Sequence, residues 1–279
     1  MSSKPSDPAF LARYGPWAVV AGASEGLGEA FARHAAARGL SVVLVARRAG
    51  ALADAASAIE ARYAVTTRTV VADLADASGA EMIIAAVADL DVGLVVHNAA
   101  LSVPGAFLDV PLPVHLAAIA VNCASQVALL HGLGRRLREC GRGGLIVVSS
   151  LSGLYGTGYL ATYAATKAFG LTLAEGLWSE LAPAVDVVAT CAGATLTPGY
   201  AARAPRRLPR LAPAPMAPDT VADDALRALG RGPRTIPGAG NRLASFLLRT
   251  LPRRRAIALM TDAGRAVLEA HHDGRVEDP

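Results

Sequence analysis

The stretch Trp17-Ala-Val-Val-Ala-Gly-Ala-Ser-Glu-Gly-Leu-Gly28 decides the fold of this chain. Its first five residues are mostly apolar and predict a short buried strand, and residues 29–38 have the composition of a helix. Three glycines lie in the spacing Gly-x-x-x-Gly-x-Gly between the two. Glycine permits a tight turn, and the unpaired N–H groups at the start of the next helix attract a diphosphate. A glycine-rich turn alone can be only a turn, but this strand-turn-helix context favours a dinucleotide site.

Strands and helices alternate along the chain from this stretch to about residue 200. We expect further strands at residues 41–46, 66–72, 94–98, 145–149 and 185–191, and helices at 48–63, 77–90, 114–140 and 160–181. Strands that alternate with helices at this spacing favour right-handed crossovers and a parallel sheet covered on both faces. The sequence therefore predicts an α/β fold whose ligands bind at the carboxyl ends of the strands.

Composition and cysteine usage restrict the class of protein. The 279 residues are 53% hydrophobic and 18% charged, which is typical of a globular protein with an ample core. Three widely spaced cysteines fit a reducing compartment, and none has metal-ligand spacing, so we expect no metal site. The N-terminus lacks the apolar region of a signal peptide, and no uninterrupted apolar run reaches the length of a membrane span. We expect a cytoplasmic protein.

The net charge of +4 is modest, but arginines concentrate in the last third of the chain. Few aromatic residues are interleaved with them, so nucleic-acid binding is a poor explanation. Residues 241–255 combine an apolar stripe with the basic end Arg253-Arg-Arg255, a pattern that also suits an anionic membrane surface. We expect instead that this helix packs against the body or a partner subunit.

Polar residues follow three of the expected strands. Arg47 and Arg48 come at the end of the second strand, where an acidic residue would bind the ribose 2′-hydroxyl of NAD and arginine suits the 2′-phosphate of NADP. Arg48 could equally begin a solvated helix, so we favour Arg47. Asp73-Leu74 and Asn98-Ala99 follow the third and fourth strands, at the edge where such sheets bind ligands.

A phenol and an ammonium group occur together in the helix expected at residues 160–181. Tyr163 and Lys167 are four residues apart and share one helix face, where a cation would favour the ionised phenol and lower its pKa. The pair alone also occurs by chance on solvated helices. Ser150, however, follows the apolar run of the fifth strand, which would deliver its hydroxyl group to the same crevice. Asn122, in the middle of the long helix, is either a satisfied core amide or part of this site.

These motifs, taken in order, resemble the short-chain dehydrogenase/reductase family over roughly residues 14–200. The motifs that carry the resemblance are Gly22-x-x-x-Gly26-x-Gly28, Asp73, His97-Asn-Ala-Ala100, Asn122, Ser150 and Tyr163-x-x-x-Lys167. His97 and Ala100 depart from the family's usual Asn-Asn-Ala-Gly. The resemblance implies a single domain over residues 1–279, with a Rossmann-like, doubly wound sheet of about seven parallel strands. It also implies hydride transfer between a nicotinamide and a carbonyl or alcohol carbon. A regulatory module that binds the dinucleotide without turnover is the alternative, although such a protein would be expected to lose Tyr163 or Lys167.

The resemblance also assigns roles to residues. Tyr163 would be the general acid/base, Lys167 would hold the nicotinamide ribose, Ser150 would bind the substrate oxygen, and Asn122 would anchor a water. Arg47 makes NADP(H) the preferred cofactor. NAD(H) stays possible, because Glu25 occupies a place that is often basic in NADP-preferring members. The expected cofactor contacts are Gly22, Ser24, Glu25, Gly26, Leu27, Gly28, Arg47, Arg48, Asp73, Leu74, Asn98, Ala99, Tyr163, Lys167, Gly193, Thr195 and Thr197.

The part of the chain beyond residue 200 departs from the shorter members of the family. Residues 194–217 resemble the family's substrate loop, with Leu196, Leu208, Leu211 and Met216 as apolar residues. A helix is expected at 218–231, a last strand at 234–238, and two helices at 241–251 and 256–269 in an extension spanning 239–272. This tail resembles 17β-hydroxysteroid dehydrogenases and long-chain ketoacyl reductases. It implies a fairly large apolar ketone or secondary alcohol as substrate, steroid-, ketoacyl- or polyketide-like, and a homodimer or homotetramer built on the two long helices.

Overall fold

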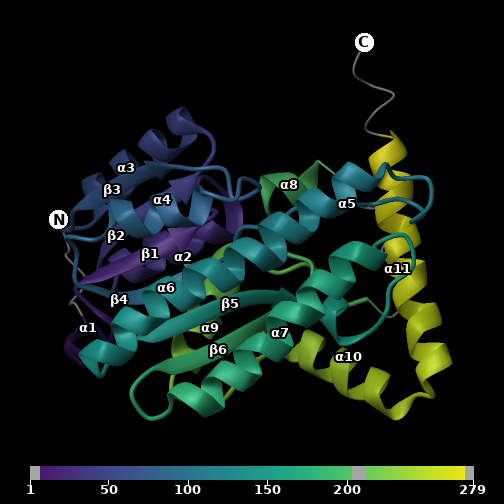
Figure 1. Cartoon of the computed structure of the whole chain (residues 1–279). Helices are drawn as coiled ribbons and strands as arrows, with labels where there is room; N and C mark the ends of the chain where they lie inside the picture. Colours follow the sequence, from purple (N-terminus) through teal and green to yellow (C-terminus); the bar gives the residue numbers. More distant parts are fainter. Residues whose placement is uncertain (1–6, 203–211, 274–279) are drawn as a thin grey trace.

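Seven parallel strands form one sheet in the computed structural model, which describes residues 7–202 and 212–273 (Figure 1). Their spatial order is β3-β2-β1-β4-β5-β6-β7, so the strand order reverses between β1 and β4 and opens a crevice at their carboxyl ends. The predicted doubly wound parallel sheet is confirmed. The strands are β1 Trp17–Ala21, β2 Ser41–Ala46, β3 Thr67–Val71, β4 Val92–His97, β5 Gly144–Ser150, β6 Asp186–Ala192 and β7 Arg234–Thr235.

Two layers of helices cover the sheet, because the inner strands are apolar on both faces. In β1, Val20 belongs to the core cluster that also holds residues of α2, α3 and α9, whereas Val19 belongs to the cluster with residues of α4, α6 and α7. The sequences of central parallel strands are typically continuous apolar runs, because both of their faces are buried. The helices are α1 Pro8–Tyr14, α2 Gly26–Ala36, α3 Ala49–Arg62, α4 Gly79–Ala86, α5 Leu112–Ile119, α6 Ser125–Cys140, α7 Ala161–Leu181, α8 Pro198–Ala201, α9 Pro218–Ala228, α10 Ala239–Thr250 and α11 Arg253–Asp273.

The helix expected at residues 114–140 is interrupted by a π turn, η1 (Ala120–Ala124), between α5 and α6. The combined segment, Leu112–Cys140, has the length and mean hydropathy (1.6) of a membrane span, which the sequence did not indicate because polar residues interrupt its apolar run. Three of these polar residues, His115, Asn122 and Gln126, are buried inside the protein. Core helices of water-soluble proteins meet the same criteria, so the feature is weak evidence for a membrane segment.

The two extra C-terminal helices are confirmed as α10 and α11, with α11 crossing beside the ends of α5 and α7 (Figure 1). The face that α10 buries carries Asn241 and Ser245 rather than its apolar stripe. Leu243, Phe246 and Leu247 are 52–64% exposed. Packing of this stripe against the body is therefore a wrong expectation, and its contact with a partner subunit stays a prediction.

Candidate active site

Ser150, Tyr163 and Lys167 come together at the carboxyl end of β5. Ser150 is the last residue of β5, and Tyr163 and Lys167 lie in the first two turns of α7, which packs on this strand. The Ser150 hydroxyl group lies close enough to the Tyr163 side chain to act on its pKa. The Lys167 Nζ atom lies 5.7 Å from the centre of the Tyr163 ring and donates a hydrogen bond to the Val148 carbonyl oxygen at 2.7 Å. The structure thus juxtaposes the three side chains that the sequence selected.

The electrostatics of this site differ from the expected pattern. Burial raises the pKa of Tyr163, and only the Ser150 hydroxyl group acts in the opposite direction. Burial also lowers the pKa of Lys167 to about 8. The expected lowering of the Tyr163 pKa by Lys167 is not seen, because the ammonium group is bound to the Val148 carbonyl and desolvation of the phenol dominates. A phenol with a raised pKa holds its proton at neutral pH.

Asn122 uses its whole amide to connect two segments around the site. Its Oδ1 accepts from the Leu101 N–H at 2.7 Å, and its Nδ2 donates to the Leu101 carbonyl and to Thr166 Oγ1 at 3.0 and 2.9 Å. Thr166 in turn donates to the Tyr163 carbonyl at 2.8 Å. Asn122 is therefore a satisfied buried amide, and its role as a water anchor stays a prediction. Thr166 was missed, although its place beside Lys167 on the same helix was a usable signal.

His97 stands where the family usually has asparagine. Its ring contacts the first two residues of α6, directly after the π turn η1 that carries Asn122. Burial lowers the pKa of His97 to about 3, so the imidazole is neutral. Its Nε2 lies 3.1 Å from Ser125 Oγ, and its Nδ1 lies 3.3 Å from Gln126 Nε2. Because the Ser125 hydroxyl already donates to the Val121 carbonyl, the imidazole must donate from Nε2. This histidine is a positioning residue beneath the segment that carries Asn122.

The glycine-rich turn forms a closely packed cradle at the start of α2. Gly22 has a φ of +83°, and a Cβ atom on Gly28 would lie 1.8 Å from the Gly22 carbonyl oxygen, so no other residue fits there. Asn98 donates from Nδ2 to the same carbonyl at 3.0 Å, and the Ala99 N–H bonds to the Ala21 carbonyl at 2.8 Å. The side chains of Leu27 and Leu74 are buried, so they support the cradle from below.

The segment after β6 lies against the opposite side of this cradle. A Cβ atom on Gly26 would be 2.9 Å from Thr197 Cγ2, so the two segments touch. Gly193 packs on Asn241 in α10, and Thr195 pairs with Met216 in a single β-bridge that ties the ends of the loop together. The predicted apolar residues Leu208 and Leu211 lie outside the described residues.

Arg48, rather than the favoured Arg47, lies over the glycine-rich turn. Its Nη2 atom is 2.7 Å from Glu25 Oε2 and 3.4 Å from Ser24 Oγ. The Arg47 side chain is 70% exposed, and its Nη1 atom lies 3.8 Å from one carboxylate oxygen of Asp73. The other carboxylate oxygen of Asp73 accepts a hydrogen bond from the Ala75 N–H. The two arginines flank the end of the cradle where an adenosine ribose would lie. Glu25 competes with any anion for Arg48.

Helix α11 contacts the loop that precedes Tyr163, a contact that no motif in the sequence indicated. Thr261 Oγ1 accepts a hydrogen bond from the Gly158 N–H at 3.0 Å, and a Cβ atom on Gly264 would collide with the Gly158 carbonyl. Arg265 lies 5.7 Å from the ring centre of Tyr159, which has a positive φ of 61°. The C-terminal extension therefore helps to shape the surroundings of Tyr163.

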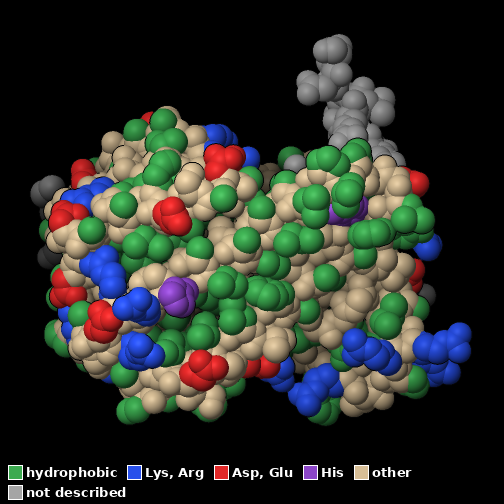
Figure 2. Space-filling model, in the orientation of Figure 1, with side chains coloured by type: hydrophobic (Ala, Val, Ile, Leu, Met, Phe, Trp, Pro, Cys, Tyr) green, Lys and Arg blue, Asp and Glu red, His purple; other side chains and the backbone are tan. Residues whose placement is uncertain are grey.

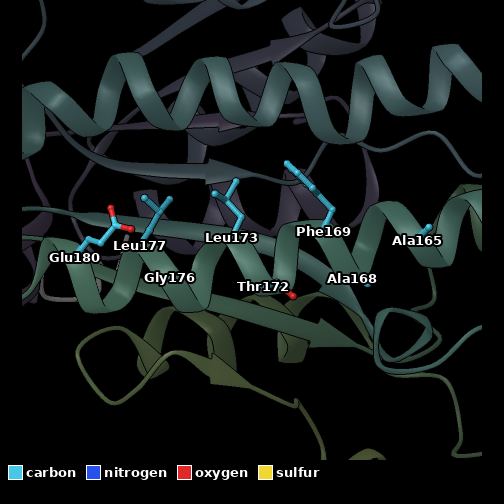
Figure 3. Close-up of a pocket in the computed structure, with 8 residues that line it drawn as sticks. All are labelled: Ala165, Ala168, Phe169, Thr172, Leu173, Gly176, Leu177 and Glu180. Carbon is cyan, nitrogen blue, oxygen red and sulfur yellow. The ribbon is translucent and has the colours of Figure 1, made fainter.

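A surface groove of about 600 Å³ lies away from the Tyr163 hydroxyl group. It runs along the outward face of α7, on the side opposite the buried turns that carry Lys167 (Figure 3). Phe169, which lines it, is 41% exposed, and nearby Trp178 is 40% exposed. The lining residues are Ala165, Ala168, Phe169, Thr172, Leu173, Gly176, Leu177 and Glu180. An apolar stripe of this kind suits a protein partner better than a small polar ligand.

The cradle fits a dinucleotide, whereas nothing in the described part of the chain fits a metal. A Cβ atom at Gly22 or Gly28 would collide with neighbouring parts of the protein itself, so both glycines are needed to close this tight turn, which leads into the first N–H groups of α2. Residues 7–202 and 212–273 contain no cluster of three His, Cys, Asp or Glu side chains able to hold a metal ion.

Comparison with known proteins agrees with this architecture. The family model described as short chain dehydrogenase matches residues 16–207. The 7beta-hydroxysteroid dehydrogenase of Clostridium sardiniense is 36% identical over 234 residues, which cover 84% of this chain and 89% of that protein. The very-long-chain 3-oxoacyl-CoA reductase of Laccaria bicolor is 34% identical over 176 residues, or 62% of this chain and 52% of that protein.

Solved structures share the fold over nearly the whole chain. A structure from a study of 7beta-hydroxysteroid dehydrogenase stereoselectivity superposes with a TM-score of 0.84 at 30% identity, covering 90% of this chain and 98% of the other. A short-chain dehydrogenase from Sphingobium yanoikuyae in complex with NADPH gives a TM-score of 0.73 at 26% identity, covering 95% and 96% of the two chains. The chain therefore belongs to the short-chain dehydrogenase family of oxidoreductases, whose members act on CH–OH groups with a nicotinamide dinucleotide.

Proposed function

We propose that this protein is an NADP(H)-dependent oxidoreductase that interconverts a ketone and a secondary alcohol on a fairly large apolar substrate. One observation carries the proposal: Ser150 and Lys167 converge on the half-buried Tyr163 side chain at the end of β5. The glycine-rich cradle opens at the same edge of the sheet. This constellation is complete, which favours an enzyme over a regulatory module that only binds the dinucleotide.

The side chains of the chain itself handle the proton, and the bound nicotinamide supplies or accepts the hydride. In reduction, Ser150 holds the carbonyl oxygen and the Tyr163 hydroxyl donates its proton to that oxygen as the carbon gains the hydride. In oxidation, Tyr163 takes the proton back. Lys167 is positioned to hold the nicotinamide ribose and to stabilise the phenolate that forms transiently.

The apolar surroundings support a large substrate. The loop over residues 194–217 contributes Leu196, which is 56% exposed, and its two ends are joined by the Thr195–Met216 bridge. The extension over residues 239–272 adds α11 next to the loop at Gly158. Because similar chains act on steroids or long-chain ketoacyl thioesters by name, a steroid-, ketoacyl- or polyketide-like ketone is the substrate class we propose.

The direct test is consumption of NADPH in the presence of ketosteroids, ketoacyl thioesters and cyclic ketones, with NADH in parallel. We expect turnover of at least one of these bulky ketones. Tight binding of NADPH with no turnover of any compound in a broad panel would contradict the proposal and favour the binding module.

Cofactor preference gives a further prediction. Arg48→Gln and Arg47→Gln are each expected to weaken NADPH binding about tenfold and to change NADH binding by less than about twofold, because only NADPH carries the 2′-phosphate. Glu25→Gln is expected to strengthen NADPH binding a few-fold, roughly, since it removes the carboxylate 2.7 Å from Arg48. Titration of protein fluorescence with each nucleotide measures these affinities. Equal losses for both nucleotides would exclude the arginines as phosphate ligands.

The groove on α7 leads to a prediction about assembly. We propose a homodimer or homotetramer in which α6 and α7 pack against their copies and cover this groove. Phe169→Asp should then convert the assembly to monomers. The new carboxylate would be buried without a partner in the interface, which costs roughly several kcal/mol of association free energy. Val71→Asp, at an exposed site on the edge strand β3, is the control and should leave the assembly intact, whereas Leu243→Asp tests the exposed stripe of α10 as the alternative interface. Light scattering coupled to size-exclusion chromatography distinguishes the two; dissociation by Leu243→Asp alone would assign the interface to α10.

A further inference from the structure

A second cavity lies at the corner where α10 meets α11, beside the edge strand β7. Its volume is about 230 Å³, below the roughly 300–1,000 Å³ of pockets that enclose drug-sized ligands. It is lined by Leu154, Tyr155, Arg234, Ser245, Arg249 and Arg253. Figure 2 shows basic side chains, here arginines, gathered at the lower right, over this corner of the molecule. A cavity of this size suits one charged group rather than a whole cofactor.

The charge in this cavity is strongly unbalanced. Arg234, Arg249 and Arg253 line it, and the one carboxylate paired with any of them among the described residues is Glu175, 3.6 Å from Arg234. The sequence contains no Asp or Glu between Asp224 and Asp262, although this stretch holds eight arginines. Guanidinium groups that share one cavity repel each other, and an anion would relieve that repulsion.

Two other groups fit an anion site. The Arg253 guanidinium lies 5.9 Å from the ring centre of Tyr155, and this contact with the aromatic ring holds it in place. Ser245 is only 4% exposed and lines the cavity, and no hydrogen bond to its hydroxyl group is found among the described residues. A buried hydroxyl without a protein partner is available as a donor to an oxygen of a ligand.

The cavity shares a wall with the catalytic crevice. Leu154 ends the 3-10 turn η2 (Leu151–Leu154), which starts directly after Ser150, and Tyr155 follows it. A Cβ atom on Gly153 would be 2.8 Å from the Lys167 backbone, so this turn packs tightly on α7 beside the catalytic residues. A group bound at Tyr155 therefore lies within one short turn of the strand end that carries Ser150.

We propose that the cavity between Arg234, Arg249 and Arg253 binds an oxyanion, a carboxylate or phosphate group. The guanidinium groups supply paired N–H donors and the Ser245 hydroxyl a further one. The oxyanion is either the acidic end of the apolar substrate or a free small anion. The site itself rests on these residues alone, and only its assignment to the substrate rests on the proposed function.

The first experiment measures the thermal unfolding temperature of the NADPH-saturated protein as inorganic phosphate is titrated at constant ionic strength, with chloride as the balancing salt. Saturation with NADPH keeps phosphate away from the glycine-rich turn. We expect a saturable rise in the parent protein and an apparent Kd about tenfold weaker in Arg249→Gln and in Arg253→Gln. Arg254→Gln, whose side chain is outside the cavity, is the matched control and should respond like the parent.

The second experiment assigns the source of the oxyanion. It compares kcat/KM for a keto acid and for its methyl ester in the parent, Arg249→Gln and Arg254→Gln. If the substrate supplies the oxyanion, the acid-to-ester ratio falls about tenfold in Arg249→Gln, through KM, and is unchanged in Arg254→Gln. An unchanged ratio together with lost phosphate binding assigns the site to a free anion.

Phosphate that stabilises all variants equally, together with an unchanged acid-to-ester ratio, would overturn the proposal. The two proposals fail separately: a protein that reduces no ketone contradicts the proposed function, while the phosphate titration still decides whether the oxyanion site exists.

Discussion

Tyr163→Phe is expected to lower kcat by a factor of about 10²–10⁴ while the Kd for NADPH changes by less than about twofold. The substitution removes only the hydroxyl group that donates the proton, and it keeps the ring in its position on α7. The loss should therefore appear in kcat and in kcat/KM alike, as expected for an interaction made in the transition state. Steady-state rates with the best ketone, together with a nucleotide titration, measure both quantities.

Two serines separated by one residue in the chain extend this experiment, and the second of them is its control. Ser150→Ala should also reduce kcat, because the Ser150 hydroxyl lies close to Tyr163 and is placed to hold the substrate oxygen. Ser152→Ala should retain the parent rate, since Ser152 contributes only its backbone N–H, which donates to Ser150 Oγ at 3.2 Å. A Tyr163→Phe enzyme that turned over as fast as the parent would show that the chemistry is assigned to the wrong group.

Lys167→Met is expected to abolish turnover and yet to stabilise the protein without nucleotide at pH 7. Burial lowers the pKa of Lys167 to about 8 in the native state, against 10.5 for an unperturbed lysine. Keeping that charge buried at pH 7 costs about 3 kcal/mol of folding free energy. The hydrogen bond to the Val148 carbonyl offsets about 1 kcal/mol of this cost, and the variant loses that bond. Methionine has a similar length without a charge, so we expect a gain of about 2 kcal/mol in the free energy of unfolding.

The dependence on pH has a definite sign. Below pH 8 lysine is protonated in both the native and the unfolded state, so the stability gap between variant and parent is constant. Between pH 8 and 10.5 the native state binds fewer protons at Lys167 than the unfolded state does, so the parent gains stability and the gap narrows. Urea unfolding at pH 7, 8.5 and 9.5 measures the difference in the free energy of unfolding between variant and parent. A difference that stays constant up to pH 9.5 would contradict a lowered pKa of Lys167.

The combination of gained stability and lost activity would identify Lys167 as a residue kept for function. A buried ammonium group is unfavourable for the free protein, but it is available for the negatively charged cofactor that binds in the crevice. The carbonyl of Val148 holds the ammonium group near Tyr163 in the meantime.

Much of the site could be predicted because its residues lie in local patterns. The strand-turn-helix around Gly22, Gly26 and Gly28 and the four-residue spacing of Tyr163 and Lys167 depend on the backbone near each residue. Thr166 is a different case. It bonds to Asn122, 44 positions earlier in the chain, so only the packing of α7 against η1 reveals the contact.

The choice between Arg47 and Arg48 also needed the folded chain. Both residues follow β2, and their order in the sequence favoured Arg47. In the structure Arg48 turns toward Ser24 and Glu25 because it is the first residue before α3, whereas Arg47 points toward Asp73. Both residues precede the helix, and Arg48 has extended backbone, in which successive side chains point to opposite sides.

By itself the sequence determined the alternation of strands and helices, the glycine cradle and the identity of Ser150, Tyr163 and Lys167, because periodicity and short motifs act over a few residues. Only the tertiary structure decided the contact of α11 with Gly158, the outward stripe of α10 and the arginine-lined cavity at their corner. These features join distant segments, such as Gly158 and Thr261, which are 103 positions apart. Which face of a helix is buried, and which side chains share a cavity, depends on the free energy of packing the whole chain rather than on any local stretch of it.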